Sequence, residues 1–249
     1  MQNTETKPLL IQTNILWFLT LTFSMIMVLS NWFDPRLITL FGFTTDAGTL
    51  VFPLTFLLSN LITEVYGYKF ARRAIWCGFI FNAIFILYGQ LVIHLPSPNY
   101  PTNNHLFDTM LAINFRIIFA SAISYLCSEP LNSYVIAKLK IRMHGKLLGL
   151  RFLLSTVIAS GVDSIIFTGI AFYGTMTIDH LIALAFTMWV IKVGIELLGL
   201  PLSISLAKKL KAKENIDIYD QSTRFNIFKL DISYTTKDNH IKLSNITPQ

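Results

Sequence analysis

Charged residues are scarce in this chain of 249 residues, of which only 14% are charged and 53% are hydrophobic. The mean hydropathy is +0.55. An ordinary soluble domain contains about 25% charged residues. The composition therefore excludes that class and predicts a protein that crosses the membrane several times.

Cysteine is also rare, because Cys77 and Cys127 are the only two. Neither belongs to a Cys-x-x-Cys or Cys/His pattern, so no disulfide and no metal site is predicted. The chain also lacks the phosphate-binding G-x-x-x-x-G-K-[S/T] loop, the H-E-x-x-H motif and a nucleophile elbow. We therefore expect no cofactor and no ATP hydrolysis by the chain itself. An intramembrane enzyme remains an alternative hypothesis, which none of these catalytic motifs supports.

Six stretches are long and apolar enough to cross a bilayer core of about 30 Å, which takes about 20 helical residues each. The runs are continuously apolar, and this pattern in lipid indicates helices. We therefore expect an all-α membrane protein that is a six-transmembrane-helix bundle. The expected spans are residues 11–32, 47–66, 74–95, 110–137, 148–173 and 178–207.

Lysine and arginine gather in alternate loops. They follow the second, fourth and sixth spans, whereas residues 96–109 and 174–177 contain none. The positive-inside rule places the basic loops in the cytoplasm, so we expect both termini there and the protein in the cell inner (plasma) membrane. This distribution accounts for the pI of about 9.3, so the lipid bilayer is an expected partner and a nucleic acid is not.

The chain divides into two predicted parts. Residues 1–207 form the transmembrane transport domain, and residues 208–249 form a polar cytoplasmic tail in which Asn, Asp, Lys and Thr become common. The tail has too little apolar surface for a packed core over residues 231–249, so disorder is expected there.

Ionisable residues interrupt the apolar runs at Arg116, Glu129, Asp163, Lys192 and Glu196. Each costs roughly 2.5 to 3.5 kcal/mol at the bilayer centre, so such residues usually face a protein interior. We expect the last four to line a polar pocket, whereas Arg116 is long enough to reach the membrane surface instead. The alternative is mutual neutralisation, with Lys192 bonding Glu196 one turn on. Such a pair contributes only about 0.2 to 0.5 kcal/mol in water.

One stripe of the second span is polar and aromatic. Asn60 and Glu64 are four residues apart and share a helix face, which Phe56 and Phe52 extend. This face is expected to line the bundle interior. Asp46 lies at the start of the span, where a carboxylate is more often a helix cap than a ligand.

Glu64 also has a simpler interpretation. It lies near the cytoplasmic end of its span, where it is close in sequence to Lys69 and Arg72. An acidic residue there neutralises basic neighbours without touching a transported solute. Both interpretations of Glu64 remain open from the sequence.

Several stretches resemble the queuosine precursor transporter family. The longest begins at Asp46 and reads D-A-G-T-L-V-F-P-L-T-F-L-L-S-N-L-I-T-E-V-Y-G-Y-K-F-A-R-R. C-S-E-P-L-N-S-Y-V-I-A-K-L-K is similar to the family's fourth span, and R-F-L-L-S-T with V-D-S-I-I-F-T-G-I-A-F-Y-G resembles its fifth. One departure is Asn60, where family members often carry Asp. An ionised acceptor is then missing at that position.

The resemblance implies uptake of 7-deazapurine bases for salvage into queuosine of tRNA. The bases are 7-cyano-7-deazaguanine, 7-aminomethyl-7-deazaguanine and queuine. A guanine-like edge offers adjacent N–H donors, which a carboxylate accepts in pairs, and its carbonyl needs a donor. The flat ring favours aromatic walls. The expected acceptors, donors and stacking residues are Glu129, Asp163, Glu196, Lys192, Asn60, Asn132, Trp189 and Phe56.

The mechanism expected from this class is alternating access around a polar pocket near the membrane midplane. A second hypothesis is that the chain is the substrate-binding membrane subunit of a vitamin-type uptake complex energised by a separate ATPase. A protein with six spans and short loops is consistent with both hypotheses. Assembly into a homo-oligomer or with an energising partner is left open.

Overall fold

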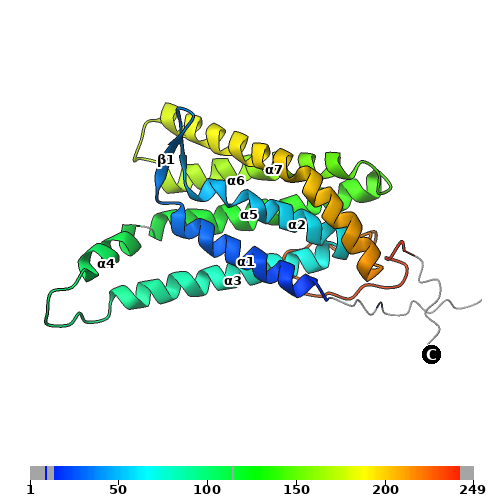
Figure 1. Ribbon diagram of the computed structural model, residues 1–249, viewed down its shortest axis with the longest axis horizontal. Coiled ribbons are helices and arrows are strands. Elements are labelled where there is room, and N and C mark those ends of the chain that lie inside the picture. The colour runs from blue at the N-terminus through cyan, green and yellow to red at the C-terminus, as the bar shows by residue number, and fades with distance from the viewer. Residues whose placement is uncertain (1–8, 10–13, 114, 242–249) are drawn as a thin grey trace, which may run out of the picture.

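The computed structural model describes residues 9, 14–113 and 115–241, which form a bundle of helices (Figure 1). The elements in chain order are α1 Leu16–Phe33, β1 Leu37–Leu40, β2 Phe43–Asp46, the short 3-10 helix η1 Gly48–Leu50, α2 Pro53–Tyr66, α3 Tyr68–Ile93, α4 Asn104–Ile113, α5 Phe115–Arg142, α6 Leu148–Phe172 and α7 Ile178–Glu214.

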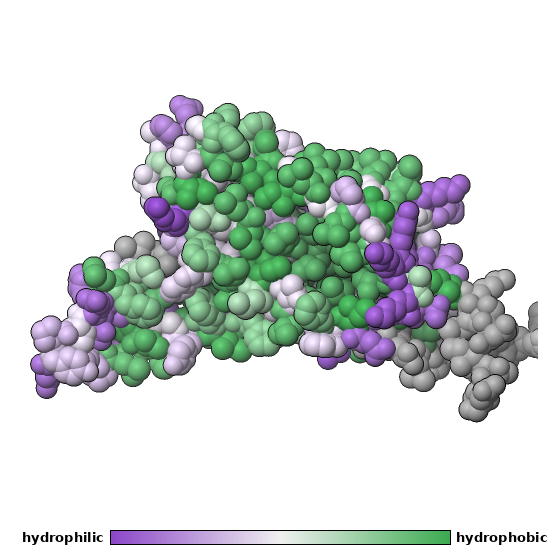
Figure 2. All heavy atoms as spheres, in the orientation of Figure 1, coloured by the Kyte–Doolittle hydropathy of each residue, from purple (hydrophilic) through white to green (hydrophobic). Residues whose placement is uncertain are grey.

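Six helical segments are long and apolar enough to cross a membrane, as the sequence predicts. The segment made of η1 and α2 is one of them, and α4 and α5 together cover another. Hydrophobic side chains cover the middle of the visible face, and hydrophilic side chains gather toward its two ends (Figure 2). The prediction of an all-α membrane protein with six spans is confirmed.

Several element boundaries differ from the predicted ones. Pro53 begins α2 instead of interrupting a longer helix, because its fixed φ and missing N–H suit the first helical turn. The antiparallel hairpin of β1 and β2, which the sequence analysis did not predict, lies in the linker after α1. At the other end of the chain, α7 continues past residue 207 to Glu214.

Gly67 alone separates α2 from α3, so α3 begins earlier than residue 74. Its φ of +86° lies in the region that favours glycine. A Cβ atom at this position would also lie 2.5 Å from the hydroxyl oxygen of Tyr234. Backbone conformation and space both require glycine at this sharp bend.

The α2 helix is the centre of the bundle. It contacts α1, α3, α5, α6 and α7, and its residues from Ser59 to Tyr66 are all buried. A polar side chain on α2 therefore meets protein on every side and needs a partner within the bundle. This position makes α2 the element that brings polar groups of several helices together.

The two ends of the bundle differ in charge. We call the end where α1, α3 and α6 begin and where α2, α5 and α7 finish the basic end, since Lys69, Arg72, Lys140, Arg151 and Lys211 lie there. The opposite end, which carries the β1–β2 hairpin, is called the hairpin end. This separation of charge follows the loop pattern of the sequence.

The segment after α7 packs against the basic end. Tyr234 is 2% exposed, and its hydroxyl donates to Asp220 Oδ1 at 2.6 Å. Within residues 231–249, which the sequence predicts to be disordered, Tyr234 fits the space beside Gly67 and Phe70, and the Asp238 carbonyl accepts from the Tyr219 N–H in the segment after α7. Residues 242–249 lie outside the described part of the chain.

Candidate functional site

Asn60 connects three helices in the middle of the bundle. Its Nδ2 donates to Glu196 Oε1 of α7 at 2.8 Å and to Thr156 Oγ1 of α6 at 3.3 Å. Its Oδ1 accepts from Asn132 Nδ2 of α5 at 2.7 Å. Asn60, Asn132 and Glu196 are each fully buried. The structure thus brings three of the predicted binding residues into one hydrogen-bonded group.

Lys192 and Asp163 form a buried ion pair between α7 and α6. The distance from Lys192 Nζ to Asp163 Oδ2 is 2.5 Å, and Ser128 donates to the other carboxylate oxygen at 3.1 Å. The ammonium also lies 5.1 Å from the centre of the Phe52 ring, which favours a cation. Lys192 therefore pairs across helices, and the local pairing with Glu196 considered from the sequence is wrong.

Glu129 is fully buried, and neither of its carboxylate oxygens has a hydrogen-bond partner among the described residues. The nearby hydroxyl of Thr55 donates to the Phe52 carbonyl, and that of Ser59 bonds Ser133. The carboxyl group lies close enough to those of Asp163 and Glu196 to interact electrostatically. Unpaired buried acceptors are rare and costly, so this position suits a ligand that brings donors.

We call the group of Asn60, Glu129, Asn132, Asp163, Lys192 and Glu196 the polar core. Its members come from α2, α5, α6 and α7. Together they offer three carboxylates, one ammonium and two amides in a part of the protein without exposed surface. This combination can bind a compact polar solute by hydrogen bonds and charge.

A small cavity lies beside the polar core toward the hairpin end. Asp34, Asp46, Asp163 and Lys192 supply its charged lining, and its volume is ≈ 10 Å³. A cavity of this size holds about one water molecule. A purine-sized solute does not fit in this cavity, and the helices pack closely around the buried polar core.

Asp34 is the charged lining residue of this cavity that was not predicted from the sequence. It is 5% exposed and interacts electrostatically with Asp46, Asp163 and Lys192. It directly follows the first apolar run, and an acidic residue at that place is the signal that was available. Asp46 caps the following turn as predicted, since it accepts from the Thr49 N–H and hydroxyl at 2.6 Å each.

Trp189 does not line the polar core as predicted. Phe56 is fully buried in an apolar cluster that also contains Phe52 and Tyr125, and its stacking role stays a prediction. The interior stripe of α7 advances every fourth residue through Met188 to Lys192, so Trp189 points about 100° away from Met188. Its indole lies in an apolar groove between α6 and α7 and donates to the Val157 carbonyl.

Arg116 also lies apart from the polar core. Its side chain is exposed and donates to the backbone carbonyls of Ile170 and Tyr173 at the end of α6. Cations near a helix C-terminus stabilise its unpaired carbonyls. The guanidinium therefore caps α6 instead of reaching a carboxylate inside the bundle.

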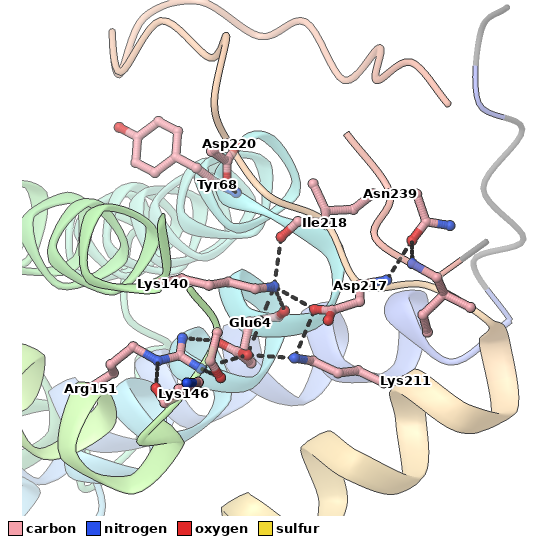
Figure 3. A network of polar contacts seen from close by, with 12 residues as sticks. Glu64, Tyr68, Lys140, Lys146, Arg151, Lys211, Asp217, Ile218, Asp220 and Asn239 are labelled. Atoms are coloured by element: carbon pink, nitrogen blue, oxygen red, sulfur yellow. Dashed lines mark hydrogen bonds and ion pairs between the residues drawn. The ribbon is translucent and has the colours of Figure 1, made fainter. Parts of the chain in front are cut away.

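Glu64 anchors a second cluster at the basic end (Figure 3). Its carboxylate pairs with Arg151, with Lys211 at 2.5 Å and with Lys140 at 3.8 Å. Lys140 and Lys211 also bind Asp217 at 2.7 and 2.8 Å. The simpler interpretation of Glu64 is thus supported, although its partners are these residues and not Lys69 or Arg72. Arg151 was assigned no role from the sequence.

This ion-pair cluster holds α2, α5, α6, α7 and the segment after α7 together. Lys140 donates to the Glu64 and Ile218 carbonyls at 2.5 and 2.6 Å. Glu64 and Arg151 are fully buried. The basic end is therefore closed by a dense set of charge-assisted bonds, in addition to the closure around the polar core.

The segment after α7 adds a second attachment to this end. Asp220 accepts from the Tyr68 N–H at 2.9 Å and from the Tyr234 hydroxyl. Burial raises the pKa of the Tyr234 phenol well above its ordinary value, and the Asp220 carboxylate raises it further. The phenol therefore stays protonated and remains a donor to Asp220 at neutral pH.

The described ranges contain no group of three or more His, Cys, Asp and Glu side chains placed to hold a metal ion.

Comparison with known proteins places these observations in a family. The model of the family described as "Putative vitamin uptake transporter" matches residues 46–206. The "Probable queuosine precursor transporter" of Bacillus subtilis (strain 168) is 27% identical over 186 residues, which cover 72% of this chain and 79% of that protein. No solved structure matches the chain.

Proposed function

Because the chain belongs to this family of vitamin uptake transporters, we propose that it imports queuosine precursors for salvage into tRNA. The proposed cargo is 7-cyano-7-deazaguanine, 7-aminomethyl-7-deazaguanine or queuine, and the proposed location is the cell inner membrane. The relative in Bacillus subtilis carries a name of this kind. The observation that carries the proposal is the polar core, whose buried carboxylate of Glu129 has no partner.

The chemistry of the polar core suits a guanine-like edge. The adjacent N–H groups of that edge donate in parallel to one carboxylate, and Glu129 has both oxygens free. The carbonyl of the base needs a donor, which Lys192 or an amide of Asn60 or Asn132 supplies. The aromatic ring of Phe52 lies beside Lys192 and takes the stacking role that Trp189 does not fill.

Alternating access is the proposed mechanism. Cargo reaches the polar core only if the helices separate, since the adjoining cavity holds about one water molecule. The ion-pair cluster of Glu64 supports a gate at the basic end, where breaking its bonds frees four helices. The basic residues there support a cytoplasmic orientation of that end and of both termini.

A cell unable to synthesise the precursors tests the function. The strain expresses the wild-type chain or Glu129→Ala and receives each base at low concentration, and queuosine in its tRNA is then measured. Wild-type protein should restore the modification, and Glu129→Ala should not. Asp179→Ala is the matched control, since Asp179 is an exposed acid at the start of α7. Equal modification with and without the wild-type chain would refute the proposal.

A further inference from the structure

We propose that Glu196 makes the transporter selective for 7-deazaguanine bases whose 7-substituent carries a protonated amine. This inference rests on the function proposed above and names the cargo more narrowly. It assigns Glu196 to the substituent and Glu129 to the guanine edge.

The polar core has more acceptors than donors. Both oxygens of Glu129, Oε2 of Glu196 and Oδ1 of Asn132 are buried without a partner. The amide and ammonium donors of the polar core are already bonded within it, because Asn60 donates to Glu196, Asn132 donates to Asn60, and Lys192 donates to Asp163. A ligand that brings several N–H donors of its own therefore suits this site.

The charges of the polar core are also unbalanced. Lys192 is paired with Asp163, so the carboxylates of Glu129 and Glu196 have no cation of their own among the described residues. These two carboxylates lie near enough to interact with each other. Buried charge without compensation is expensive, so a buried carboxyl group that has no cation beside it binds a proton instead. A cationic cargo stabilises the ionised form of these carboxyl groups, and a neutral base does not.

The two glutamates differ in the oxygens they have free. Glu129 has two, which suits the paired N–H donors of the guanine edge. Glu196 has one, because Asn60 binds the other at 2.8 Å. A single free carboxylate oxygen suits an ammonium group. A nitrile nitrogen, which only accepts, would face acceptors there.

Competition for uptake tests the selectivity on the wild-type protein. Cells or proteoliposomes take up labelled 7-aminomethyl-7-deazaguanine in the presence of unlabelled 7-aminomethyl, 7-cyano or 7-methyl base. We expect the aminomethyl base to compete at least about tenfold better than the two neutral bases, since hydrogen bonds to charged groups are the stronger ones. Equal competition by the neutral bases would overturn the inference.

Two variants assign the selectivity to a residue. Glu196→Gln keeps an acceptor for Asn60 but replaces the free carboxylate oxygen by an amide donor, so the preference for the amine should fall to within about threefold. Glu129→Gln should lower uptake of both classes together, and Asp179→Asn is the acid-to-amide control at an exposed site. Equal losses of both classes in Glu196→Gln would contradict the assignment.

The outcomes separate this inference from the function it rests on. If wild-type protein takes up neither base, the proposed function fails. If it takes up both without preference, only the selectivity fails. The amounts of each variant in the membrane are compared first, and the wild-type competition decides the inference even if a variant does not fold.

Discussion

Some single residues in this bundle carry charges that are buried as close ion pairs. Glu64 and Arg151 are both fully buried, and each is the other's bidentate partner. Removing one member of such a pair costs more than the pair contributes, because the remaining charge stays in a medium of low dielectric.

Glu64→Ala should therefore lower the free energy of unfolding by about 3 to 5 kcal/mol, which is the range for breaking a buried ion pair. Thermal unfolding in detergent measures this effect. Lys229→Ala is the control, since Lys229 is 51% exposed and pairs with Asp231 only at 3.9 Å. Equal melting temperatures of Glu64→Ala and the wild-type protein would contradict the account of the ion-pair cluster.

Asp231 provides a pH dependence outside the membrane. Partial burial by itself raises the pKa of this carboxyl group, but the hydrogen bonds and charges of Lys69 and Arg72 outweigh it and lower the pKa. A depressed pKa in the folded state stabilises the protein above the unfolded value of about 3.9.

Asp231→Asn should thus lower the melting temperature slightly at pH 7. The difference between variant and wild type should shrink as the pH falls below about 4 and disappear below the lowered pKa of the folded state, where the carboxylate is protonated in both states. The effect is small because the side chain is 30% exposed. A difference that persists unchanged at low pH would indicate that the charge is not its cause.

At the scale of elements, α2 and η1 set the position of the polar core. Gly48 of η1 packs against the end of α1, where an added Cβ atom would lie 1.8 Å from Asp34 Oδ1 and 2.6 Å from the Ser30 carbonyl. The Ser30 carbonyl belongs to the backbone and has little room to move. The absence of a side chain at Gly48 thus allows α1 and α2 to converge beside the small cavity.

Gly48→Ala should destabilise the protein by about 1 to 3 kcal/mol, as overpacking does in other interiors. Gly194→Ala is the matched control, because a Cβ atom at Gly194 on α7 would meet nothing within 4 Å. Alanine there should be neutral or stabilising, since it favours the helix. Denaturation of both variants under the same conditions compares them, and similar stabilities would refute the close contact.

The helices show which parts of the fold follow from sequence and which do not. The spans are predictable because long apolar runs dominate their energetics in lipid. The β1–β2 hairpin is not, since its strands of four residues each carry no distinct pattern. The pairing of Glu64 with Arg151 depends on how α2 and α6 meet, which spacing within one helix does not determine.

The polar core is also only partly predictable from the sequence. Asn60, Glu129, Asn132, Asp163, Lys192 and Glu196 are predictable because ionisable and amide groups in apolar runs face the interior. The position of Trp189 is not predictable, because an aromatic residue on a membrane helix is stable whether it faces the protein interior or the lipid.

As a whole molecule, the protein is closed twice, around the polar core and at the basic end. In the proposed import mechanism, release of cargo at the basic end requires the ion-pair cluster of Glu64 to open. Lys211 is the most exposed cation of that cluster, at 18%. Its removal weakens the closure while leaving Arg151 and Lys140 on Glu64.

Lys211→Ala should therefore shift the population toward states open at the basic end. The shift is measured with the variant Ser133→Cys in a chain whose Cys77 and Cys127 are replaced. Ser133 is fully buried beside the polar core, so a cysteine there becomes accessible only when the helices separate. A water-soluble thiol reagent should label it several-fold faster in the Lys211→Ala variant than with Lys211 in place. Unchanged labelling rates would exclude the ion-pair cluster as a gate.

Counterflow with the purified protein tests the central claim most directly. Proteoliposomes loaded with unlabelled 7-aminomethyl-7-deazaguanine are placed in labelled base, and exchange is followed over time. The account predicts exchange by the wild-type protein, none by Glu129→Ala and normal exchange by Asp179→Ala. Exchange by Glu129→Ala at the wild-type rate, or none by the wild-type protein, would contradict the claim that the polar core binds the base.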